Sequence, residues 1–346
     1  MLATLLDAVR EIHLTEVPDP QVHHPTDAVV RVTAACICGS DLHPYRGKAP
    51  TAFPKRIGHE FIGVVESVGS AVATLTPGDL VIAPFAISDG TCRHCLRGLP
   101  TSCEHGSFWG APDRTGILAD GGQSEFVRVP LADGTLVRAG DAGDDLVPDL
   151  LALTDVMGTG HHAAVSARVA PGDTVVVVGD GAVGQCGVLA ARRLGAERVV
   201  MMSRHPDRQD LARAMGATDI VDQRGDDGVA AVRELLGPDG ADAALECVGS
   251  QESMAQAVGA VRPGGRLGCV GAPFGQLPLG QMFARNIGYA GGVAPVRAYL
   301  PDLLADVLAG DLRPGRVFDT ELALADVAEG YRAMDERRSI KVLLRP

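Results

Sequence analysis

The chain has 346 residues, of which 46% are hydrophobic, and a formal net charge of -12 at pH 7. This length exceeds what one hydrophobic core usually supports, so we expect two domains. The acidic balance argues against nucleic acids and acidic membranes as partners, because binding to phosphate groups requires clustered Lys and Arg.

The N-terminal stretch MLATLLDAVREIHLTEVPDP has no cationic segment ahead of an apolar one, and the sequence contains no apolar run long enough to span a bilayer. We therefore expect a cytoplasmic protein without a membrane partner. In a reducing compartment, the eight cysteines are better explained as metal ligands and buried apolar groups than as disulfides.

Residues 1–155 contain alternating β-type runs such as DAVVRVTAACIC, which predict a mostly antiparallel β domain with functional loops. Two early segments, CICGSDLH at 36–43 and GHEFIGVVESVG at 58–69, contain metal-binding residue types. Cys38 and His59 would supply a thiolate and an imidazole, two of the three protein ligands that a catalytic zinc needs. Either residue alone would be explained more simply as part of the core.

A cysteine cluster follows in ISDGTCRHCLRGLPTSC at 87–103, which contains Cys92, Cys95 and Cys103. A structural zinc is closed by four ligands. The cluster therefore indicates a zinc site whose fourth ligand is not evident from the cysteines alone.

Residues 156–290 alternate short apolar strands with helical segments. This alternation predicts βαβ units and a doubly wound parallel sheet of the Rossmann type. The strands are expected at 174–179, 198–203, 219–222, 242–249 and 265–271.

The first of these strands ends in VVVVGDGAVG, a GxGxxG motif followed by a helical segment. The glycines permit a tight turn, a close approach to a pyrophosphate, and close packing of the helix on the strand. We expect dinucleotide binding here, with contacts from Gly179, Gly181, Ala182, Val183 and Gly184.

The end of the second strand indicates which dinucleotide is bound. An enzyme that selects NAD carries a carboxylate there, whereas this chain has Ser203 and Arg204, with Arg208 one helical turn further on. A hydroxyl beside a guanidinium suits the 2′-phosphate of NADP(H), so we predict NADP(H) as the cofactor. The alternative is that Arg204 and Arg208 are solvated surface charges.

Residues 291–346 read as helix, strand, helix and strand, and are too few to form a core of their own. We expect them to pack on the first domain. The predicted division is a catalytic domain of residues 1–155 and 291–346 and a dinucleotide-binding domain of residues 156–290.

Four motifs in order resemble the zinc-dependent medium-chain alcohol dehydrogenases over nearly the whole chain. They are CGSDxH at 38–43, GHE at 58–60, the cysteine cluster at 89–103 and the GxGxxG motif. The resemblance implies an α/β protein with a GroES-like catalytic domain, a small-molecule substrate, and assembly as a homodimer or homotetramer.

The resemblance also implies a catalytic zinc held by Cys38 and His59, with Glu60 beside them as a transient ligand and Asp41 orienting His59. Many relatives take a third ligand, a cysteine, from just before the nucleotide domain. Asp155 stands at that position here. Its alternative role is that of a helix N-cap.

In relatives, the structural zinc is bound by the pattern C-x2-C-x2-C-x7-C, which puts the missing first ligand at Asp89. A carboxylate is a competent zinc donor, so Asp89, Cys92, Cys95 and Cys103 can close a tetrahedron. The alternatives are loss of this zinc, or replacement of Asp89 by His94 or His105.

By resemblance, Ser40 accepts the alcohol proton and His43 passes it to solvent. The alternatives are a turn hydroxyl and a surface imidazole. The remaining cofactor contacts implied by the resemblance fall on Thr159, Val270, Gly271 and, near the pyrophosphate, Lys341.

Phe85 falls at a pocket-lining position of relatives, and Phe108 and Trp109 follow the cysteine cluster. Aromatic walls favour an apolar or aromatic alcohol or aldehyde over a polyol. The alternative is that Phe108 and Trp109 only anchor the zinc loop.

The sequence therefore predicts a zinc-dependent enzyme that interconverts an alcohol and an aldehyde or ketone with NADP(H). One alternative is a polyol, threonine or formaldehyde dehydrogenase on the same scaffold. The other is a zinc-free quinone reductase or a non-catalytic NADPH-binding protein.

Overall fold

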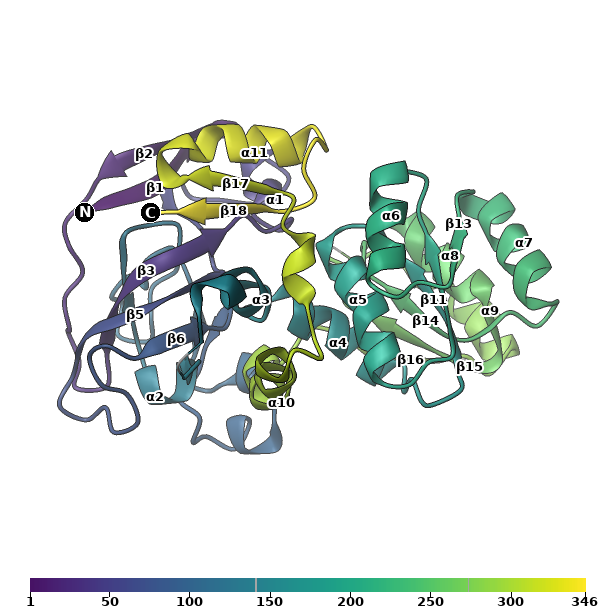
Figure 1. Ribbon diagram of the computed structural model, residues 1–346, viewed down its shortest axis with the longest axis horizontal. Coiled ribbons are helices and arrows are strands. Elements are labelled where there is room, and N and C mark those ends of the chain that lie inside the picture. Colours follow the sequence, from purple (N-terminus) through teal and green to yellow (C-terminus); the bar gives the residue numbers. More distant parts are fainter. Residues whose placement is uncertain (141, 273) are drawn as a thin grey trace. The chain divides into compact units, whose positions relative to one another are not determined.

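The computed structural model describes residues 1–140, 142–272 and 274–346. The chain divides into two compact units, which Figure 1 colours by sequence. The first unit is Met1–Asp155 together with Pro295–Pro346, and the second is Val156–Ala294. The second unit therefore ends at Ala294, slightly beyond the boundary expected from sequence.

The first unit is built on a mostly antiparallel sheet, in the strand order β10-β6-β5-β3-β18-β17, with β9 also pairing with β3. Its strands are β3 (Ala28–Cys36), β5 (Phe61–Val68), β6 (Leu80–Ala83), β9 (Phe126–Val129), β10 (Val137–Arg138), β17 (Thr320–Ala323) and β18 (Val342–Arg345). The C-terminal strand β18 pairs antiparallel with β3, with Leu343 opposite Cys36. This pairing ties the last part of the chain to the first.

Smaller sheets and helices complete the first unit. A three-stranded sheet has the order β2 (Glu11–Glu16), β1 (Leu2–Ala8) and β4 (Lys55–Arg56), and β7 (Ala86–Ile87) pairs with β8 (Ser107–Phe108). The helices are α1 (Leu42–Tyr45), α2 (Ala132–Thr135), α3 (Val147–Ala152), α10 (Val296–Ala309) and α11 (Val327–Asp335).

The second unit is a parallel sheet in the order β13-β12-β11-β14-β15-β16. Its strands are β11 (Thr174–Val178), β12 (Arg198–Met202), β13 (Asp219–Val221), β14 (Ala241–Glu246), β15 (Val261–Cys269) and β16 (Gly288–Gly291). The helices between and before them are α4 (Val156–Ser166), α5 (Ala182–Arg193), α6 (Pro206–Ala214), α7 (Gly225–Leu236), α8 (Gln251–Ala260) and α9 (Leu279–Ala284). The predicted α/β fold class with a Rossmann-type sheet is confirmed.

The burial patterns of the strands explain why one sheet is covered on both faces and the other is partly solvated. In TVVVV of β11, every residue after Thr174 is buried, as a strand covered by helices on both faces requires. In β3 the buried residues are interrupted by exposed Arg31, as expected for a strand with one partly solvated face. No helix in the described ranges is long and apolar enough to cross a membrane.

One buried ion-pair cluster stabilises the first unit. Arg128 is only 2% exposed, and its guanidinium contacts the carboxylates of Asp27, at 3.3 Å, and Asp113. Asp27 also accepts hydrogen bonds from the backbone N–H groups of His23 and His24. The cluster joins β9 to two loops that are distant in sequence.

We expect Arg128→Ala to destabilise the first unit by about 3–5 kcal/mol, because it leaves two buried carboxylates without their cation. The matched control is Arg138→Ala, since Arg138 pairs with Asp79 at 3.2 Å but is 59% exposed. That variant should cost less than about 1 kcal/mol. Urea unfolding followed by the fluorescence of Trp109, the single tryptophan, measures both changes in the first unit. Equal effects of the two substitutions would contradict the prediction.

Candidate active site

The pairing of β3 with β5 builds the first cluster of candidate ligands. Ala35 lies opposite Phe61, and the Cys36 N–H donates to the carbonyl oxygen of Glu60 at 3.1 Å. Because the strands are antiparallel, residues just after β3 lie beside residues just before β5. Cys38 and His59 are therefore neighbours.

Asp155, immediately before α4, joins these residues. Its Oδ2 lies 3.6 Å from Cys38 Sγ and 3.5 Å from His59 Nε2. Ligand atoms of Cys38, His59, Glu60 and Asp155 all lie within 4.8 Å of one another. The structure thus brings together the three residues expected to bind the catalytic zinc, with Glu60 beside them.

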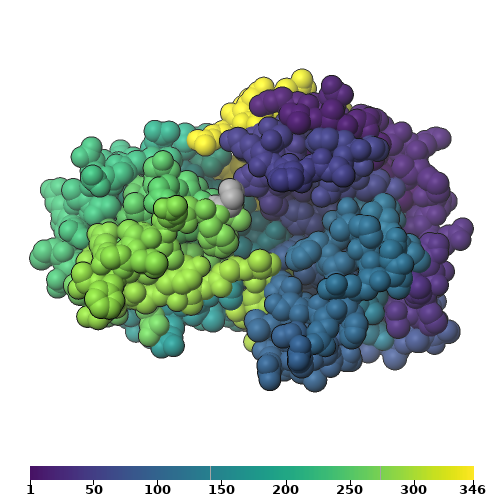
Figure 2. Space-filling view, turned by 180° about the vertical axis from the view of Figure 1, so that it is seen from behind, coloured from purple at the N-terminus to yellow at the C-terminus, as the bar shows by residue number. Residues whose placement is uncertain are grey.

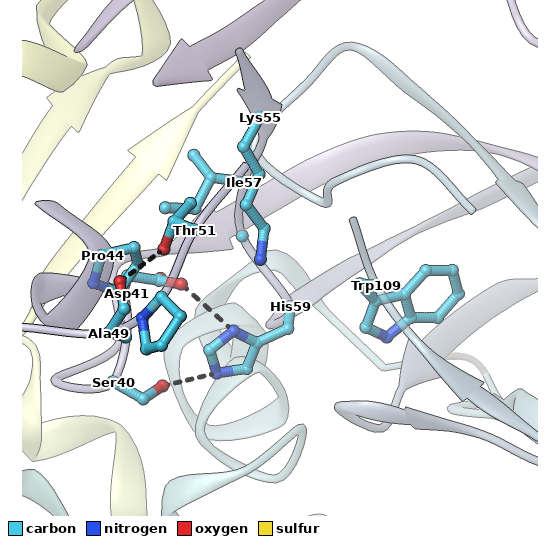
Figure 3. A pocket seen from close by; sticks show the side chains of 11 residues that line it. Ser40, Asp41, Pro44, Ala49, Thr51, Lys55, Ile57, His59 and Trp109 are labelled. Carbon is cyan, nitrogen blue, oxygen red and sulfur yellow. Dashed lines mark hydrogen bonds and ion pairs between the residues drawn. The ribbon is translucent and has the colours of Figure 1, made fainter. Parts of the chain in front are cut away.

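Asp41 and Ser40 contact the two nitrogens of His59 (Figure 3). Asp41 Oδ1 is 3.2 Å from Nδ1, and its Oδ2 accepts from the backbone N–H of Cys38 at 3.0 Å. Asp41 is only 5% exposed, so these contacts fix the imidazole firmly. The Ser40 hydroxyl lies 3.4 Å from Nε2, on the side of the ligand cluster.

The electrostatics of the cluster favour a bound cation. Burial raises the pKa of the Cys38 thiol, and the carboxylates of Glu60 and Asp155 raise it further. Burial alone would lower the pKa of His59, but the charges of Asp41 and Cys38 and the bonds to the carboxylates raise it well above its usual value. Acidic groups crowded in a buried place repel one another, and a divalent cation removes that repulsion.

Glu60 forms a buried ion pair with Lys341 at 2.8 Å, and these side chains are 0% and 1% exposed. The Lys341 ammonium also donates to the carbonyl oxygen of Ile37 at 3.4 Å, and the Cys36 thiol donates to Glu60 Oε2 at 3.2 Å. Lys341 was expected near a pyrophosphate. In this arrangement its ammonium binds a buried carboxylate of the first unit instead.

Sequence reasoning missed Gln123 and Tyr331 as supports of this site. The Gln123 amide donates to Asp41 Oδ2 at 3.4 Å, and the buried Tyr331 hydroxyl donates to Gln123 Oε1 at 3.0 Å. Neither residue belongs to a motif. Because their partners lie far away in the chain, local sequence contained no signal for them.

The second cluster gathers Asp89, Cys92, Cys95 and Cys103, whose ligand atoms also lie within 4.8 Å of one another. Asp89 Oδ1 accepts from the backbone N–H groups of Thr91 and Cys92, at 2.8 and 2.9 Å. Burial raises the pKa of Asp89, but hydrogen bonds from Cys92, His105 and Thr91 lower it far more. The carboxylate is therefore ionised and oriented as a metal ligand must be.

The two histidines considered as substitutes for Asp89 lie differently. His105 Nδ1 is 2.5 Å from Asp89 Oδ2, so His105 contacts the fourth residue of the cluster rather than taking its place. His94 caps the short helical turn Cys95–Arg97 and is not among the four clustered residues. The described arrangement favours Asp89 over both.

A pocket of ≈ 210 Å³ lies beside His59, and its lining includes Ser40, Asp41, Lys55 and Trp109 (Figure 3). Trp109 is 5% exposed, and its indole N–H donates to the Pro84 carbonyl oxygen at 2.9 Å. Its ring packs edge-on against Phe61, with 5.0 Å between centroids. Trp109 therefore anchors its loop in the core as well as lining the pocket.

The predicted aromatic wall is a pair of phenylalanines. Phe85 presents its edge to His59 at a centroid distance of 6.4 Å, and Phe108 stacks on Phe85 with an interplanar angle of 8°. Phe108 is 47% exposed, so this apolar surface is open to a ligand. His43, the expected proton carrier, is half-buried in α1.

The glycine motif of the second unit has the expected local geometry. Gly179 has a φ of +114°, which turns the chain after β11. A Cβ on Gly184 would collide with the Gly179 carbonyl oxygen, whereas one on Gly181 would meet no atom within 4 Å. Gly184 thus permits α5 to pack closely, and the backbone at Gly181 is open to an incoming phosphate.

The other predicted cofactor residues of the second unit occupy three places. Ala182 and Val183 form the first turn of α5. Thr159 lies in α4. Val270 and Gly271 follow β15 and donate their backbone N–H groups to the Glu246 carbonyl oxygen, at 2.9 and 3.2 Å.

The end of β12 holds a polar cluster that includes Asp180, a residue that sequence reasoning passed over. Ser203 is buried, and its hydroxyl donates to Asp180 Oδ2 at 2.6 Å. The Arg208 guanidinium is 3.2 Å from Asp180 Oδ1. Arg208 is therefore paired within the unit, not a solvated charge, while Arg204 is exposed.

Arg224, at the N-terminus of α7, is a second residue that was missed. Burial lowers the pKa of His205, Asp180 raises it, and the guanidinium charges of Arg208, Arg204 and Arg224 lower it. The charges of three arginines thus act on one imidazole that follows β12. The position of Arg224 shortly after the third strand of the alternating pattern was the available signal.

Comparisons with known proteins agree with this geometry. Residues 24–141 match the alcohol dehydrogenase GroES-like domain, and residues 182–305 match the zinc-binding dehydrogenase domain. An uncharacterized zinc-type alcohol dehydrogenase-like protein of Bacillus subtilis (strain 168) is 32% identical, and the match covers 100% of both chains. A formaldehyde dismutase of Pseudomonas putida is 30% identical over 97% of this chain and 95% of the relative.

Among solved structures, an alcohol dehydrogenase from Thermus sp. ATN1 superposes with a TM-score of 0.91. It shares 34% sequence identity, and the match covers 100% of this chain and 99% of that one. Whole-chain relatives and both domain matches lead to one conclusion: the chain belongs to the zinc-dependent medium-chain dehydrogenase/reductase family and is an oxidoreductase of the zinc-type alcohol dehydrogenase kind.

Proposed function

We propose that this protein interconverts an alcohol and an aldehyde or ketone by hydride transfer to or from NADP(H). The observation that carries the proposal is the convergence of Cys38, His59 and Asp155, with the ring of Phe85 edge-on to His59 and Phe108 stacked on Phe85. Three protein donors leave one position open for substrate, as a catalytic zinc requires.

The donor set fits zinc. A thiolate, an imidazole and a carboxylate are ordinary zinc ligands, and the two acids balance the charge of a divalent ion. When bound, the zinc supplies Lewis-acid polarisation of the substrate oxygen. Asp41 holds His59 by Nδ1, which leaves Nε2 directed at Asp155 and Cys38 for coordination.

Ser40 and His43 carry the proton in this proposal. The Ser40 hydroxyl, 3.4 Å from His59 Nε2, is placed to accept the proton that an alcohol loses on oxidation. His43 lies in α1, shortly after Ser40, and is half-buried, and we assign to it the exchange of this proton with solvent.

Asp89, Cys92, Cys95 and Cys103 would hold a second, structural zinc. Four protein donors close the coordination shell, so this site supplies stability to its loop and no place for substrate.

The substrate class follows from the two phenylalanine rings beside His59. The stacked pair of Phe85 and Phe108 favours an apolar or aromatic alcohol over a polyol, which needs several polar partners. Formaldehyde is the second candidate, because a formaldehyde dismutase is among the whole-chain relatives. Steady-state assays with benzyl alcohol, short primary alcohols, sorbitol, threonine and formaldehyde distinguish these candidate substrates. Turnover of sorbitol without turnover of benzyl alcohol would overturn the aromatic-substrate proposal.

NADP(H) preference is supported by the residues that directly follow β12, which are Ser203 and Arg204 and include no acid. Arg204 is exposed beside buried Ser203, and the charges of Arg204 and Arg224 both act on the imidazole of His205. Guanidinium groups form strong charge-assisted bonds to phosphate.

We also propose a cytoplasmic homo-oligomer. The free thiols suit a reducing compartment. Strand β16 ends the sheet of the second unit, and Figure 2 shows the segment that contains it, in light green, on one face. Four apolar residues in and near this edge are exposed. Their exposed fractions are 67% for Leu279, 88% for Phe283, 46% for Tyr289 and 60% for Val293. An unpaired edge strand with exposed apolar side chains suits pairing with a second copy of the chain.

Elemental analysis tests the metal proposal, and we expect two zincs per chain. Asp155→Ala should lose one zinc and at least about a hundredfold in activity, because substrate polarisation is lost. Asp155→Cys should retain both zincs, since it restores a thiolate donor. Asp89→Ala should lose the other zinc and lower the thermal stability. An Asp155→Ala protein that keeps two zincs would refute the assignment of Asp155.

Steady-state kinetics with both cofactors test the NADP(H) preference. We expect Arg204→Ala to lower kcat/KM for NADPH about tenfold or more, by loss of a charge-assisted phosphate bond, with little effect on NADH. The matched control is Arg213→Ala, because Arg213 is 55% exposed in α6 and pairs with Asp210 at 3.1 Å. A wild-type enzyme that prefers NADH would contradict the proposal.

The mass in solution tests the oligomer. Light scattering should give the wild-type protein a multiple of the 35.9 kDa chain mass. Phe283→Asp should lower that mass, because it places a charge in the proposed apolar contact. Leu308→Asp, at a 48% exposed position of α10, is the control that should leave the mass unchanged. A monomeric wild-type protein would exclude the proposal.

A further inference from the structure

Asp180 is an acid inside the phosphate-binding glycine motif, between Gly179 and Gly181. Its carboxylate is not solvated, since the residue is 7% exposed. One oxygen accepts from the Ser203 hydroxyl at 2.6 Å, and the other pairs with Arg208 at 3.2 Å. Both partners lie in the segment just after β12, where the adenosine ribose of a dinucleotide is recognised.

Ser203 and Arg208 are two of the donors that the proposed 2′-phosphate site requires. In the structure both are already bound to an anion, which is the carboxylate of Asp180. We propose that Asp180 is a specificity-determining residue: it occupies the anion position of the ribose site and weakens the binding of NADP(H) relative to NAD(H). This inference rests on the proposed function only in placing the adenosine ribose beside Ser203.

The physical reason is competition between two anions for the same donors. A 2′-phosphate carries about two negative charges, so it would meet a like charge within hydrogen-bonding range of the hydroxyl and guanidinium that it needs. The 2′-hydroxyl of NAD(H) instead finds a carboxylate acceptor. Asp180 thus supplies, from the glycine motif, the acid that is absent at the end of the second strand.

Asp180 is held in place by its surroundings. Gln185 donates to the Asp180 carbonyl oxygen at 3.4 Å and to the Arg208 carbonyl oxygen at 2.9 Å, which ties the glycine motif to α6. A second donor, Gln209, fixes the Ser203 carbonyl oxygen at 2.8 Å. Because the backbone is held independently of the carboxylate, the charge can be removed with the geometry largely retained.

The test is Asp180→Asn, which removes the charge and keeps the shape. We expect the ratio of kcat/KM for NADPH to that for NADH to rise about tenfold or more, because a like charge is removed and two phosphate donors are released. Calorimetry provides a readout independent of activity. Adenosine 2′,5′-bisphosphate should bind the variant more tightly than the wild type, while 5′-AMP, whose 2′-hydroxyl loses a charged acceptor, should bind the variant no more tightly than the wild type.

The matched control is Asp207→Asn, a nearby exposed carboxylate in the first turn of α6, which should leave the ratio unchanged. If Asp180→Asn fails to fold, Asp180→Ser serves the same purpose. An unchanged cofactor ratio with unchanged bisphosphate affinity, or a shift toward NADH, would overturn the inference. A wild-type preference for NADH with a shift toward NADPH in the variant would refute the proposed NADP(H) preference and sustain the role of Asp180.

Discussion

The first unit depends on one constraint, the crowding of acidic groups around His59. Cys38, Glu60 and Asp155 bring their ligand atoms within 4.8 Å of the imidazole nitrogen and of one another in a largely buried place. Such a cluster is stable only when cations compensate it. The chain supplies one of them, since Lys341 neutralises Glu60. The remaining thiolate and carboxylate have the charge and the donor types that a divalent zinc requires.

Aspartate stands at both positions where the family resemblance leads one to expect cysteine. Contacts with neighbouring groups orient both carboxylates. Asp89 is fixed by two backbone N–H groups and His105, and Asp155 lies immediately before α4, beside the thiol of Cys38 and the imidazole of His59. A carboxylate preserves the charge of the thiolate it replaces. The surrounding hydrogen bonds fix the orientation of each carboxylate within its cluster.

The second unit also combines opposite charges in the segments that follow β11 and β12. The charges of three arginines act on His205, and Asp180 in the glycine motif opposes them and pairs with Arg208. A cluster of guanidinium groups without any acid would favour a phosphate strongly. On our proposal, the one buried carboxylate among them lowers the selectivity for a phosphate. We therefore expect opposing charges, and not a single residue after the second strand, to set the choice of cofactor.

The sequence alone was enough to predict the fold class, because βαβ alternation and a glycine motif follow local rules of burial and backbone conformation. Motif spacing and family resemblance also singled out Cys38, His59 and Asp155, whose ligand atoms the fold brings within 4.8 Å of one another. The partners of those residues were decided by tertiary structure. Lys341 reaches Glu60 because β18 pairs with β3, and Gln123 reaches Asp41 from a distant loop. Asp180 shows the same limit, since the GxGxxG pattern leaves its second position open and only folding brings that side chain to Ser203 and Arg208. Contacts between residues far apart in sequence leave no periodic or local signal, so they are not visible in the linear chain.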